Sequence, residues 1–534
     1  MKKTLHTFLF LLLAHALMAQ GIDERINEWF TPIADAWGNI VLHIFPGTEA
    51  IFGQGIPTII ILLVSGALFF TFYFGFINVR RFPLAINVVR GKYDDIEGHS
   101  AHENVNVNVQ DGDLVDTIRD ESQDGEVSHF QALATAVSGT VGNGNIAGVA
   151  LAIALGGPGA TFWMILCGLI GMSTKFVECT LGVKYRDVGE DGTVYGGPMY
   201  YMTKGLKERG MAGLGKVLAA IFAILCVGAS FGGGNAAQSN QAAQEIASSF
   251  NMTGGSARTI IGLILMFFVG IIIIGGIKRI ASVTEKVVPF MAVMYIIACL
   301  YIIFTNFSLV DDAFGQIFSQ AFNPQAGLGG LFGVLIVGFQ RAAFSNEAGA
   351  GSASIAHSAV KTKYAASEGL VALLEPFIDT VVICTMTALV IIIFNTGQGE
   401  FLYGGDGSGT VVIGGESLQG AGITSAAFGS YIPFAGPFLT VAVVLFAVST
   451  MISWSYYGLQ SWMYLFGKSK FADLSYKFLF LAFVVIGAAG DMSAVWTFSD
   501  AMILALVFPN MIALILLFPV VKRELTKYLT AIGK

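Results

Sequence analysis

Long apolar runs separated by short polar segments cover most of the chain. A helix needs about 20 apolar residues to cross a hydrocarbon core of roughly 30 Å, and about 11 runs meet or approach this length. They cover approximately residues 56–79, 130–155, 160–183, 215–235, 258–276, 281–306, 328–356, 369–394, 432–466, 476–489 and 492–518. The pattern therefore predicts an all-α integral membrane protein with about 11 transmembrane helices.

Two of these runs contain residues that interrupt a helix. Residues 138–148 read SGTVGNGNIAG, and residues 344–352 read FSNEAGAGS. Each Gly destabilises a helix interior by about 1 kcal/mol relative to Ala, and Asn competes with the backbone for hydrogen bonds. In hydrocarbon, unwound backbone is tolerable only where it lines a cavity or binds a ligand. A single Gly-rich run would equally fit close helix packing through small residues.

The two interrupted runs occupy matching places, the first and sixth positions among the core helices. This arrangement predicts a five-plus-five inverted repeat, with residues 129–306 as the first repeat, 307–518 as the second and 56–79 as an extra amino-terminal span. The amino ends of half-helices offer N–H groups to a carboxylate, and exposed carbonyls hold a small cation. An amino acid and a cation are the ligand pair that such breaks favour.

Composition supports the membrane assignment and excludes several functions. Charged residues make up only 12% of the chain, against about 25% in soluble proteins, while hydrophobic residues reach 54% and mean hydropathy is +0.70. The net charge of −7 and the lack of a basic cluster exclude nucleic-acid binding. The five cysteines fall inside apolar runs and are expected to be buried thiols. No HExxH motif occurs and no Ser/His/Asp set fits one depth, so an enzyme is not predicted.

The distribution of basic residues predicts the orientation. Most of the 29 lysines and arginines fall in residues 80–128, 184–216, 277–286, 357–368, 467–477 and 519–534, which the positive-inside rule makes cytoplasmic. We expect a multi-pass protein of a bacterial-type inner (plasma) membrane, with its amino end outside and its carboxyl end cytoplasmic.

The segments outside the spans have distinct expected roles. Residues 1–19 resemble a signal peptide, either cleaved near Ala19 or kept as an anchor, and residues 20–55 form a periplasmic interfacial segment. Residues 80–128 are a cytoplasmic acidic insertion, either a mobile loop or a regulatory domain. Residues 519–534 form a cytoplasmic tail.

Several charged residues lie inside the predicted spans, where they default to function. Helical spacing pairs Lys175 with Glu178, and it places Glu375 four residues before Asp379. Arg341 is expected to pair with Glu347. Each pair is either a fixed structural contact or part of a gate or proton sensor. The histidines show no ligand spacing, and we assign them no function.

Several motifs resemble the alanine or glycine:cation symporter family, also called amino acid carrier proteins. They are residues 142–149 (GNGNIAGV), 156–185, 195–200 (YGGPMY), 344–356, 377–380 (FIDT) and 449–458, which contain Ser449-Thr450 and WSYYG. The resemblance implies a leucine-transporter-like fold and sodium- or proton-coupled uptake of alanine or glycine by alternating access. Asn143 departs from the family, which commonly has Thr at this position, so the identity of the amino acid is open.

A substrate carboxylate in low dielectric must be fully hydrogen-bonded. We expect it at the N–H groups of Gly142, Gly144 and Asn145, helped by the side chain of Asn143 or Asn145. By analogy with the fold, carbonyls of Thr140, Phe344 and Ser345 accept from the ammonium group. Thr450 and Trp454 are four residues apart, on one helical face, and Trp454 and Phe344 would limit side-chain size. Gln238 belongs to a polar patch, residues 235–240, which resembles a family patch near the site or is simply a helix end turning polar.

Sodium is a hard cation that prefers oxygen ligands. By resemblance to sodium-coupled relatives of the fold, carbonyls of Ser138, Val141 and Phe446 and hydroxyls of Ser449 and Thr450 would surround it. The sequence thus predicts a sodium-coupled symporter that imports alanine or glycine across the lipid bilayer, with Na⁺ as coupling ion and no other cofactor. The alternatives are a proton-coupled transporter of another small neutral amino acid and, in a different class, an ion channel. L or D stereochemistry and oligomeric state stay open.

Overall fold

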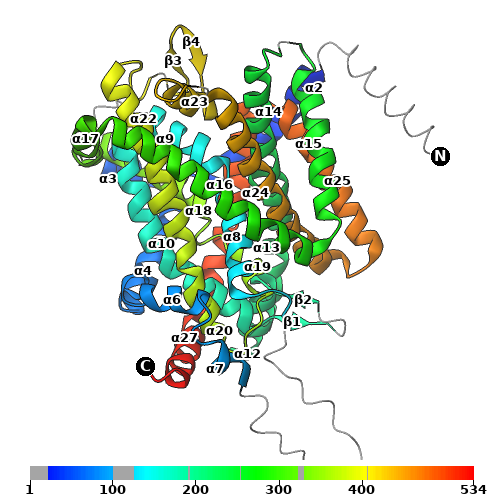
Figure 1. Ribbon diagram of the computed structural model, residues 1–534. Helices are drawn as coiled ribbons and strands as arrows, with labels where there is room; N and C mark the ends of the chain where they lie inside the picture. The colour runs from blue at the N-terminus through cyan, green and yellow to red at the C-terminus, as the bar shows by residue number, and fades with distance from the viewer. Residues whose placement is uncertain are drawn as a thin grey trace, which may run out of the picture.

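The computed structural model describes residues 22–99, 125–189, 193–252, 254–322, 330–405, 407–433 and 435–534. Within these ranges the chain is a bundle of long helices with two short hairpins, and its carboxyl end lies at the opposite end of the bundle from the β3–β4 hairpin (Figure 1). The expected signal peptide, residues 1–19, and residues 100–124 of the expected insertion lie outside the described residues.

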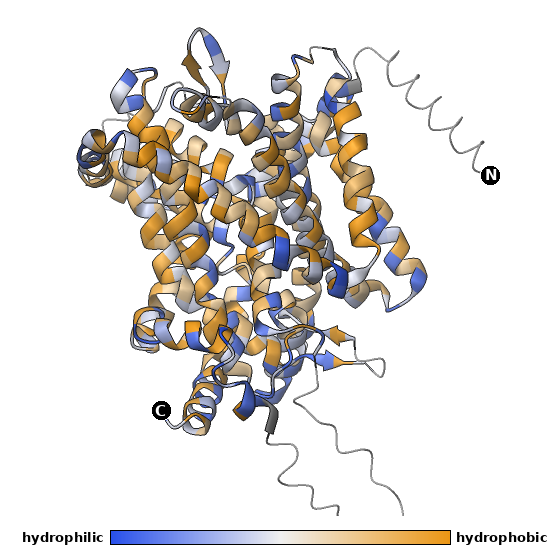
Figure 2. Cartoon of the chain, in the orientation of Figure 1, coloured by the Kyte–Doolittle hydropathy of each residue, from blue (hydrophilic) through white to orange (hydrophobic). Residues whose placement is uncertain are grey.

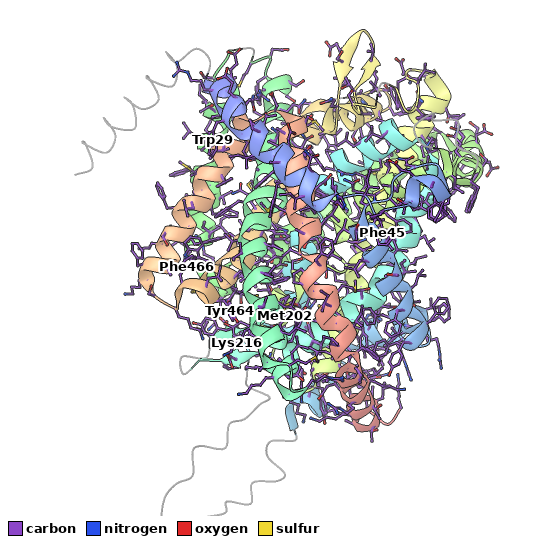
Figure 3. All side chains as sticks on the ribbon, turned by 180° about the vertical axis from the view of Figure 1, so that it is seen from behind. Trp29, Phe45, Met202, Lys216, Tyr464 and Phe466 are labelled. Atoms are coloured by element: carbon purple, nitrogen blue, oxygen red, sulfur yellow. The ribbon has the colours of Figure 1, made fainter. Side chains whose placement is uncertain are left out.

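The amino-terminal segment wraps the outside of the bundle. It comprises α2 (Ile22–Val41), α3 (Thr48–Phe52), α4 (Thr58–Tyr73), α5 (Ile77–Arg80), α6 (Phe82–Val89) and α7 (Asp94–His99). Helix α2 packs against α26, and from behind it crosses the bundle with Trp29 on its outer side (Figure 3). Trp29 is exposed, as an interfacial helix requires.

The first half of the core begins with a helix that is broken early. Its elements are α8 (His129–Thr140), η1 (Gly144–Gly148), α9 (Val149–Gly156), α10 (Gly159–Lys184), α11 (Pro198–Tyr200), η2 (Tyr201–Gly205), α12 (Leu206–Glu208), α13 (Ala212–Phe231), η3 (Gly232–Ala236), α14 (Ala237–Ser249), α15 (Ala257–Ile273) and α16 (Gly276–Thr305). An antiparallel hairpin of β1 (Asp187–Val188) and β2 (Val194–Tyr195) pairs Asp187 with Tyr195.

The second half contains the other interrupted helix. Its helices are η4 (Phe307–Leu309), α17 (Val310–Phe322), α18 (Gly330–Asn346), α19 (Ala353–His357), α20 (Ala365–Ala372), α21 (Leu374–Pro376), η5 (Phe377–Cys384), α22 (Thr385–Gln398), α23 (Ala421–Gly429), α24 (Ala435–Phe466), α25 (Lys470–Ala489), α26 (Met492–Ala505) and α27 (Val507–Ala531). Strands β3 (Val411–Ile413) and β4 (Glu416–Leu418) form an antiparallel hairpin with Val411 opposite Leu418.

Among the described residues, seven helices are long and apolar enough to cross a membrane, or eight with the bent pair His129–Thr140 and Gly144–Gly156. Two further apolar helices, Thr58–Tyr73 and Ala257–Ile273, are shorter. The chain is therefore an all-α membrane protein. The count of about 11 spans and the inverted repeat stay predictions.

Apolar residues dominate the helices along the middle of the bundle, and hydrophilic residues gather at its two ends (Figure 2). Large apolar side chains such as Phe267 on α15, Phe290 on α16 and Phe478 on α25 are exposed. An apolar exterior of this extent is expected where lipid replaces water.

The polar patch at residues 235–240 lies inside the protein. Asn235, Gln238 and Asn240 are buried, because η3 continues α13 directly into α14. The interpretation of this patch as a helix end turning polar at the surface is therefore wrong. All five cysteines are free and buried, which confirms their prediction as small core residues.

Candidate functional site

The first interrupted helix breaks where the sequence predicts it. Helix α8 starts at His129 behind a capping box, in which Gln131 N donates to Ser128 Oγ and Ser128 N donates to Gln131 Oε1. It ends at Thr140, and α8 and the next helical stretch, Gly144–Gly156, are bent by 51°. Carbonyls at the end of α8 therefore lose their helical partners inside the protein.

Side chains satisfy the backbone at this break. Gly142 N donates to Asn145 Oδ1 at 2.9 Å, and Asn143 N donates to Gln238 Oε1 at the same distance. Asn143 Nδ2 donates to the carbonyl of Gln238 at 3.2 Å. The predicted residues Gly142, Asn143, Asn145 and Gln238 thus form one hydrogen-bonded group. Two of the three N–H groups expected at a carboxylate, those of Gly142 and Asn145, are engaged internally.

The second interruption lies between α18 and α19. Glu347, Gly349 and Gly351 have φ values of 56°, 98° and 84°, so the chain leaves the helix in a left-handed path. Asn346 Oδ1 accepts from Ala348 N at 3.0 Å, and Glu178 Oε1 on α10 accepts from Gly349 N at 2.9 Å. Side chains again replace the hydrogen bonds that a continuous helix would have made.

The five residues predicted to hold sodium converge where α8 meets α24. Thr450 Oγ1 lies 3.0 Å from the carbonyl of Ser138 and 3.5 Å from that of Val141. Ser138 Oγ donates to the carbonyl of Ser449 at 2.7 Å, and Ser449 Oγ donates to that of Phe446 at 2.9 Å. The structure therefore brings these backbone and hydroxyl oxygens into one buried cluster, which we call the oxygen cluster.

The oxygen cluster adjoins the first break. An ideal Cβ on Gly142 would overlap Thr450 Oγ1 and lie 3.0 Å from Gln238 Oε1. A Cβ on Gly144 would lie 3.4 Å from the ring of Phe344 and 3.5 Å from Ser345 Cα, across the gap to the second interrupted helix. Gly142 therefore allows a close approach that a larger residue would prevent, whereas a Cβ at Gly144 would make ordinary van der Waals contact with Phe344 and Ser345.

Thr140 and Trp454 lie differently from the other predicted substrate residues. Thr140 Oγ1 donates to the carbonyls of Ala136 and Val137 in its own helix, at 3.3 Å each. Trp454 is buried, and its indole N–H donates to Glu347 Oε1 at 2.8 Å. In this structure Trp454 therefore binds the second break.

Asp379 connects the two breaks. Asn145 Nδ2 donates to Asp379 Oδ1 at 2.7 Å, and Ser345 Oγ donates to Asp379 Oδ2 at 2.8 Å. Thr380 Oγ1 also donates to this carboxylate, at 2.7 Å. The sequence did not identify Asp379 as a site residue. It lies within the FIDT motif, and helical spacing placed it only together with Glu375, as a structural pair or as part of a gate or proton sensor.

The ion pairs predicted from helical spacing are wrong. Lys175 Nζ contacts Glu375 Oε1 at 3.0 Å, and Glu178 instead accepts from Gly349 N and from Asn510 Nδ2. Glu375 therefore bonds Lys175 and does not pair with Asp379. For Lys175 the buried partner comes from another helix, α21, and not from the next turn of its own helix, α10.

Arg341 pairs with Asp500 of α26, not with Glu347. Its guanidinium also lies 5.7 Å from the ring centre of Phe344 and 5.4 Å from that of Trp496. Arg341, Asp500 and Trp496 line a cavity of about 220 Å³. Phe344 packs against Trp496 of this cavity's wall, with ring centroids 4.9 Å apart, and it also lies beside Gly144 at the first break.

The chain is similar to known transporters over most of its length. Residues 41–534 match the model of the sodium:alanine symporter family. The chain is 40% identical over 479 residues to the sodium/alanine symporter AgcS of Methanococcus maripaludis, covering 90% of this chain and 95% of that protein. It is 34% identical over 472 residues to the probable sodium/glutamine symporter GlnT of Bacillus subtilis, covering 88% of this chain and 87% of that protein.

Among solved structures, MhsT in complex with L-phenylalanine aligns at a TM-score of 0.45 and 17% identity, covering 74% of this chain and 99% of that chain. The family match spans most of the chain, and the matched family consists of multi-pass membrane transporters, not enzymes. The chain belongs to the sodium:alanine symporter family.

Proposed function

We propose that the chain is a sodium-coupled symporter that imports a small neutral amino acid, alanine or glycine, by alternating access. The observation that carries this proposal is the oxygen cluster. It joins the end of one interrupted helix to an unbroken one, at the point where the substrate residues begin.

The chemistry of the oxygen cluster suits sodium. Its members are carbonyl and hydroxyl oxygens, which are hard ligands, and the set predicted from the sequence contains no carboxylate. The carbonyls of Ser138 and Val141 are available because α8 ends at Thr140. Phe446 lies one turn before Ser449 and Thr450 on α24, where a hydroxyl oxygen can turn from its carbonyl acceptor to an ion.

The amino acid would bind beside the cluster at the first break. Asn145 Oδ1 and Gln238 Oε1 accept from the N–H groups of Gly142 and Asn143. These amide oxygens show that an oxygen acceptor, such as a substrate carboxylate, fits at this break. We propose that the substrate carboxylate binds at the N–H groups of Gly142, Gly144 and Asn145, with help from the side chain of Asn143 or Asn145. Carbonyls of Thr140, Phe344 and Ser345 would accept from the ammonium group. The close approach of Phe344 to Gly144 favours a small side chain.

The proposed orientation follows the lysines and arginines, with the amino end outside and the carboxyl end cytoplasmic. We propose the same segments as above: signal peptide 1–19, interfacial segment 20–55, extra span 56–79, insertion 80–128, repeats 129–306 and 307–518, and tail 519–534. The protein would reside in a bacterial-type inner membrane.

The proposal is tested with purified protein in proteoliposomes. Uptake of labelled alanine, glycine and glutamine, in L and D forms where they exist, is measured with an inward sodium gradient and with sodium replaced by potassium. Sodium-dependent uptake of alanine or glycine supports the proposal, and equal uptake in both salts overturns sodium coupling. Counterflow, in which internal unlabelled substrate drives accumulation of label, would be absent from a channel.

A further inference from the structure

A second group of buried charges lies apart from the oxygen cluster and the substrate residues. It connects α7, α8, α10 and α19 through α21, and all of its side chains are buried. We call it the proton cluster, and its members are Glu97, His129, Lys175, His357, Glu368 and Glu375.

The members of the proton cluster form one continuous chain of contacts. Glu97 Oε2 lies 3.0 Å from His129 Nε2, and the other ring nitrogen of His129 contacts Glu368 Oε2. Glu368 Oε1 lies 2.5 Å from His357 Nδ1. His357 Nε2 lies 3.6 Å from Glu375 Oε2, whose other oxygen binds Lys175 at 3.0 Å.

The contacts of His129 require an additional proton. Both of its ring nitrogens face carboxylate oxygens, and a neutral imidazole has only one N–H to donate. Either the ring is an imidazolium or one of the carboxyl groups is protonated.

The charge balance of the whole cluster leads to the same result. Glu97, Glu368 and Glu375 are balanced by one ammonium, that of Lys175, unless the two imidazoles also carry charge. Unbalanced charge at such buried positions is strongly disfavoured.

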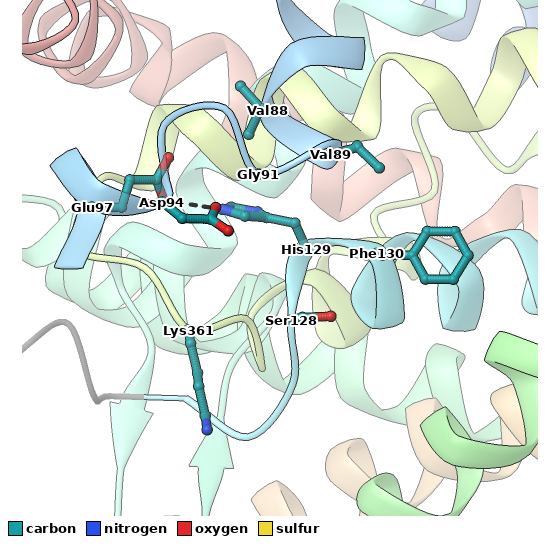
Figure 4. Close-up of a pocket in the computed structure, with 9 residues that line it drawn as sticks. All are labelled: Val88, Val89, Gly91, Asp94, Glu97, Ser128, His129, Phe130 and Lys361. Atoms are coloured by element: carbon teal, nitrogen blue, oxygen red, sulfur yellow. Dashed lines mark hydrogen bonds and ion pairs between the residues drawn. The ribbon is translucent and has the colours of Figure 1, made fainter.

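The cluster reaches one surface of the molecule. Glu97 and His129 line a cavity of about 270 Å³, together with Asp94 and Lys361 (Figure 4). This cavity lies at the end of the bundle that carries α7, the β1–β2 hairpin and the end of α27, which we call the tail face (Figure 1). From there the contacts lead inward to Lys175, which is completely buried. Protons can therefore enter from the tail face.

Other charged groups face the cluster from the surrounding elements. Glu285 on α16 accepts from Gln131 of α8 at 2.8 Å, and Tyr528 on α27 lies near Glu97. Deeper in the bundle, Glu178, Glu347 and Asp379 lie close enough to Lys175 or Glu375 to interact electrostatically. Hydroxyls of Thr362 and Ser367 donate to Glu97. The carboxyl groups among them, Glu178, Glu285, Glu347 and Asp379, add negative charge and strengthen the demand for protons, whereas the hydroxyl donors add none.

The positions of the two histidines allow the cluster to connect the ends of the two interrupted helices. His129 is the first residue of α8, and His357 is the last residue of α19, so each lies at the tail-face end of an interrupted helix. Glu368 bonds both rings and holds these two ends together. Opening the site to the tail face would require α8 to leave Glu97 and Glu368.

We propose that the proton cluster is a proton-binding site that locks the tail-face ends of α8 and α19 while it is protonated and releases them when it loses protons. This inference rests on the proposed function, in which the tail face is cytoplasmic and the site opens to it during transport. The ligand is the proton, and its binding sets how often the closed site opens to that side.

The test measures opening directly. Thr135 is buried on α8 and its hydroxyl lies 3.2 Å from that of Thr284 on α16. Thr135→Cys, in a background with the five native cysteines replaced by alanine or serine, reports opening through its rate of modification by a charged methanethiosulfonate reagent. The reagent and the pH change are applied to each side of reconstituted vesicles in separate arms. Lys534→Cys, at the exposed chain end, corrects for thiol ionisation.

We expect the corrected rate to rise by about fivefold or more as the tail-face pH goes from about 6 to about 9, because lost protons shift the closed–open equilibrium. His129→Gln should give a high rate that does not change with pH, and Glu368→Gln should reduce the pH response. The matched control is His43→Gln, a substitution of an exposed histidine on the opposite side, which should keep the parent response.

A parent rate that is independent of pH on both sides overturns the proposal, as does a parent-like response in His129→Gln. If His129→Gln fails to fold, His357→Gln provides the same comparison. The accessibility assay needs neither sodium nor substrate. A pH response without sodium-dependent uptake therefore refutes the proposed transport function and leaves the proton cluster standing, and the converse result refutes the cluster alone.

Discussion

The side-chain amide of Asn145 lies between two backbone interruptions, accepting from Gly142 N and donating to the carboxylate of Asp379 at 2.7 Å. The same carboxylate accepts from Ser345 on the second interrupted helix. One asparagine thus fixes the geometry of the first break and ties it to the other half of the molecule.

Asn145→Ala should abolish sodium-dependent uptake. The substitution leaves Gly142 N and Asp379 Oδ1 without these partners, and each stranded buried group costs about 1–3 kcal/mol. Uptake of labelled alanine into proteoliposomes measures the effect, with thermal unfolding in detergent to check folding. Asn39→Ala, on the exposed side of α2, should retain uptake. Normal uptake by Asn145→Ala would remove this residue from the site.

Thr450→Val should weaken sodium binding without changing side-chain size. Loss of the hydroxyl removes one proposed oxygen ligand, and the half-saturating sodium concentration should rise by about tenfold or more, equivalent to about 1.4 kcal/mol. Thr450→Ser keeps the oxygen and should keep most of the affinity. Thr440→Val is the matched control on the same helix, since Thr440 bonds Ser249 and not the oxygen cluster. An unchanged sodium dependence in Thr450→Val would contradict the assignment.

Gly142→Ala should block transport through steric overlap. The added Cβ would collide with Thr450 Oγ1 and lie 3.0 Å from Gln238 Oε1, so both side chains must move. Overpacking of this kind costs about 1–3 kcal/mol. Gly213→Ala is a suitable control, because its Cβ would meet nothing within 4 Å. The two variants are compared by their initial uptake rates at saturating sodium. Equal rates would show that transport does not require the close approach of Thr450 to Gly142.

The Arg341–Asp500 pair should be coupled energetically. Asp500→Asn leaves a buried guanidinium without its counter-charge, a loss of about 3–5 kcal/mol for a buried pair. The double variant Arg341→Gln/Asp500→Asn removes both charges and should recover much of that stability. Thermal unfolding of the four proteins forms a double-mutant cycle. Additive effects of the two single substitutions would show that the pair contributes no coupling.

The breaks were predictable because they depend on local chemistry. Residues 138–148 and 344–352 combine Gly with Asn in apolar surroundings, and the backbone leaves the helix within each of them. The oxygen cluster was also found, through the resemblance at Ser138 and Ser449-Thr450. The first prediction uses information contained in short stretches of sequence, whereas the second depends on the family resemblance, because Ser138 and Ser449 are 311 residues apart.

The charge contacts were not predictable for the opposite reason. Lys175 and Glu375 are 200 residues apart, and Arg341 and Asp500 are 159 apart, so only the tertiary fold brings them together. Helical spacing suggested nearer partners that the structure does not use. His129 and His357 showed no ligand spacing, because their shared partner, Glu368, comes from a third element.

Helix α24 runs without interruption for 32 residues, whereas α8 stops after 12. Some oxygens of the oxygen cluster belong to the long helix α24, and the others belong to the end of the short helix α8. A cation held there would hold α8 and α24 together, because moving α8 away from α24 would remove two of its five oxygens, the carbonyls of Ser138 and Val141. Binding of the ion and contact between α8 and α24 must then favour each other by the same free energy. The ion concentration alone would therefore shift the equilibrium between the two orientations of the site in the membrane.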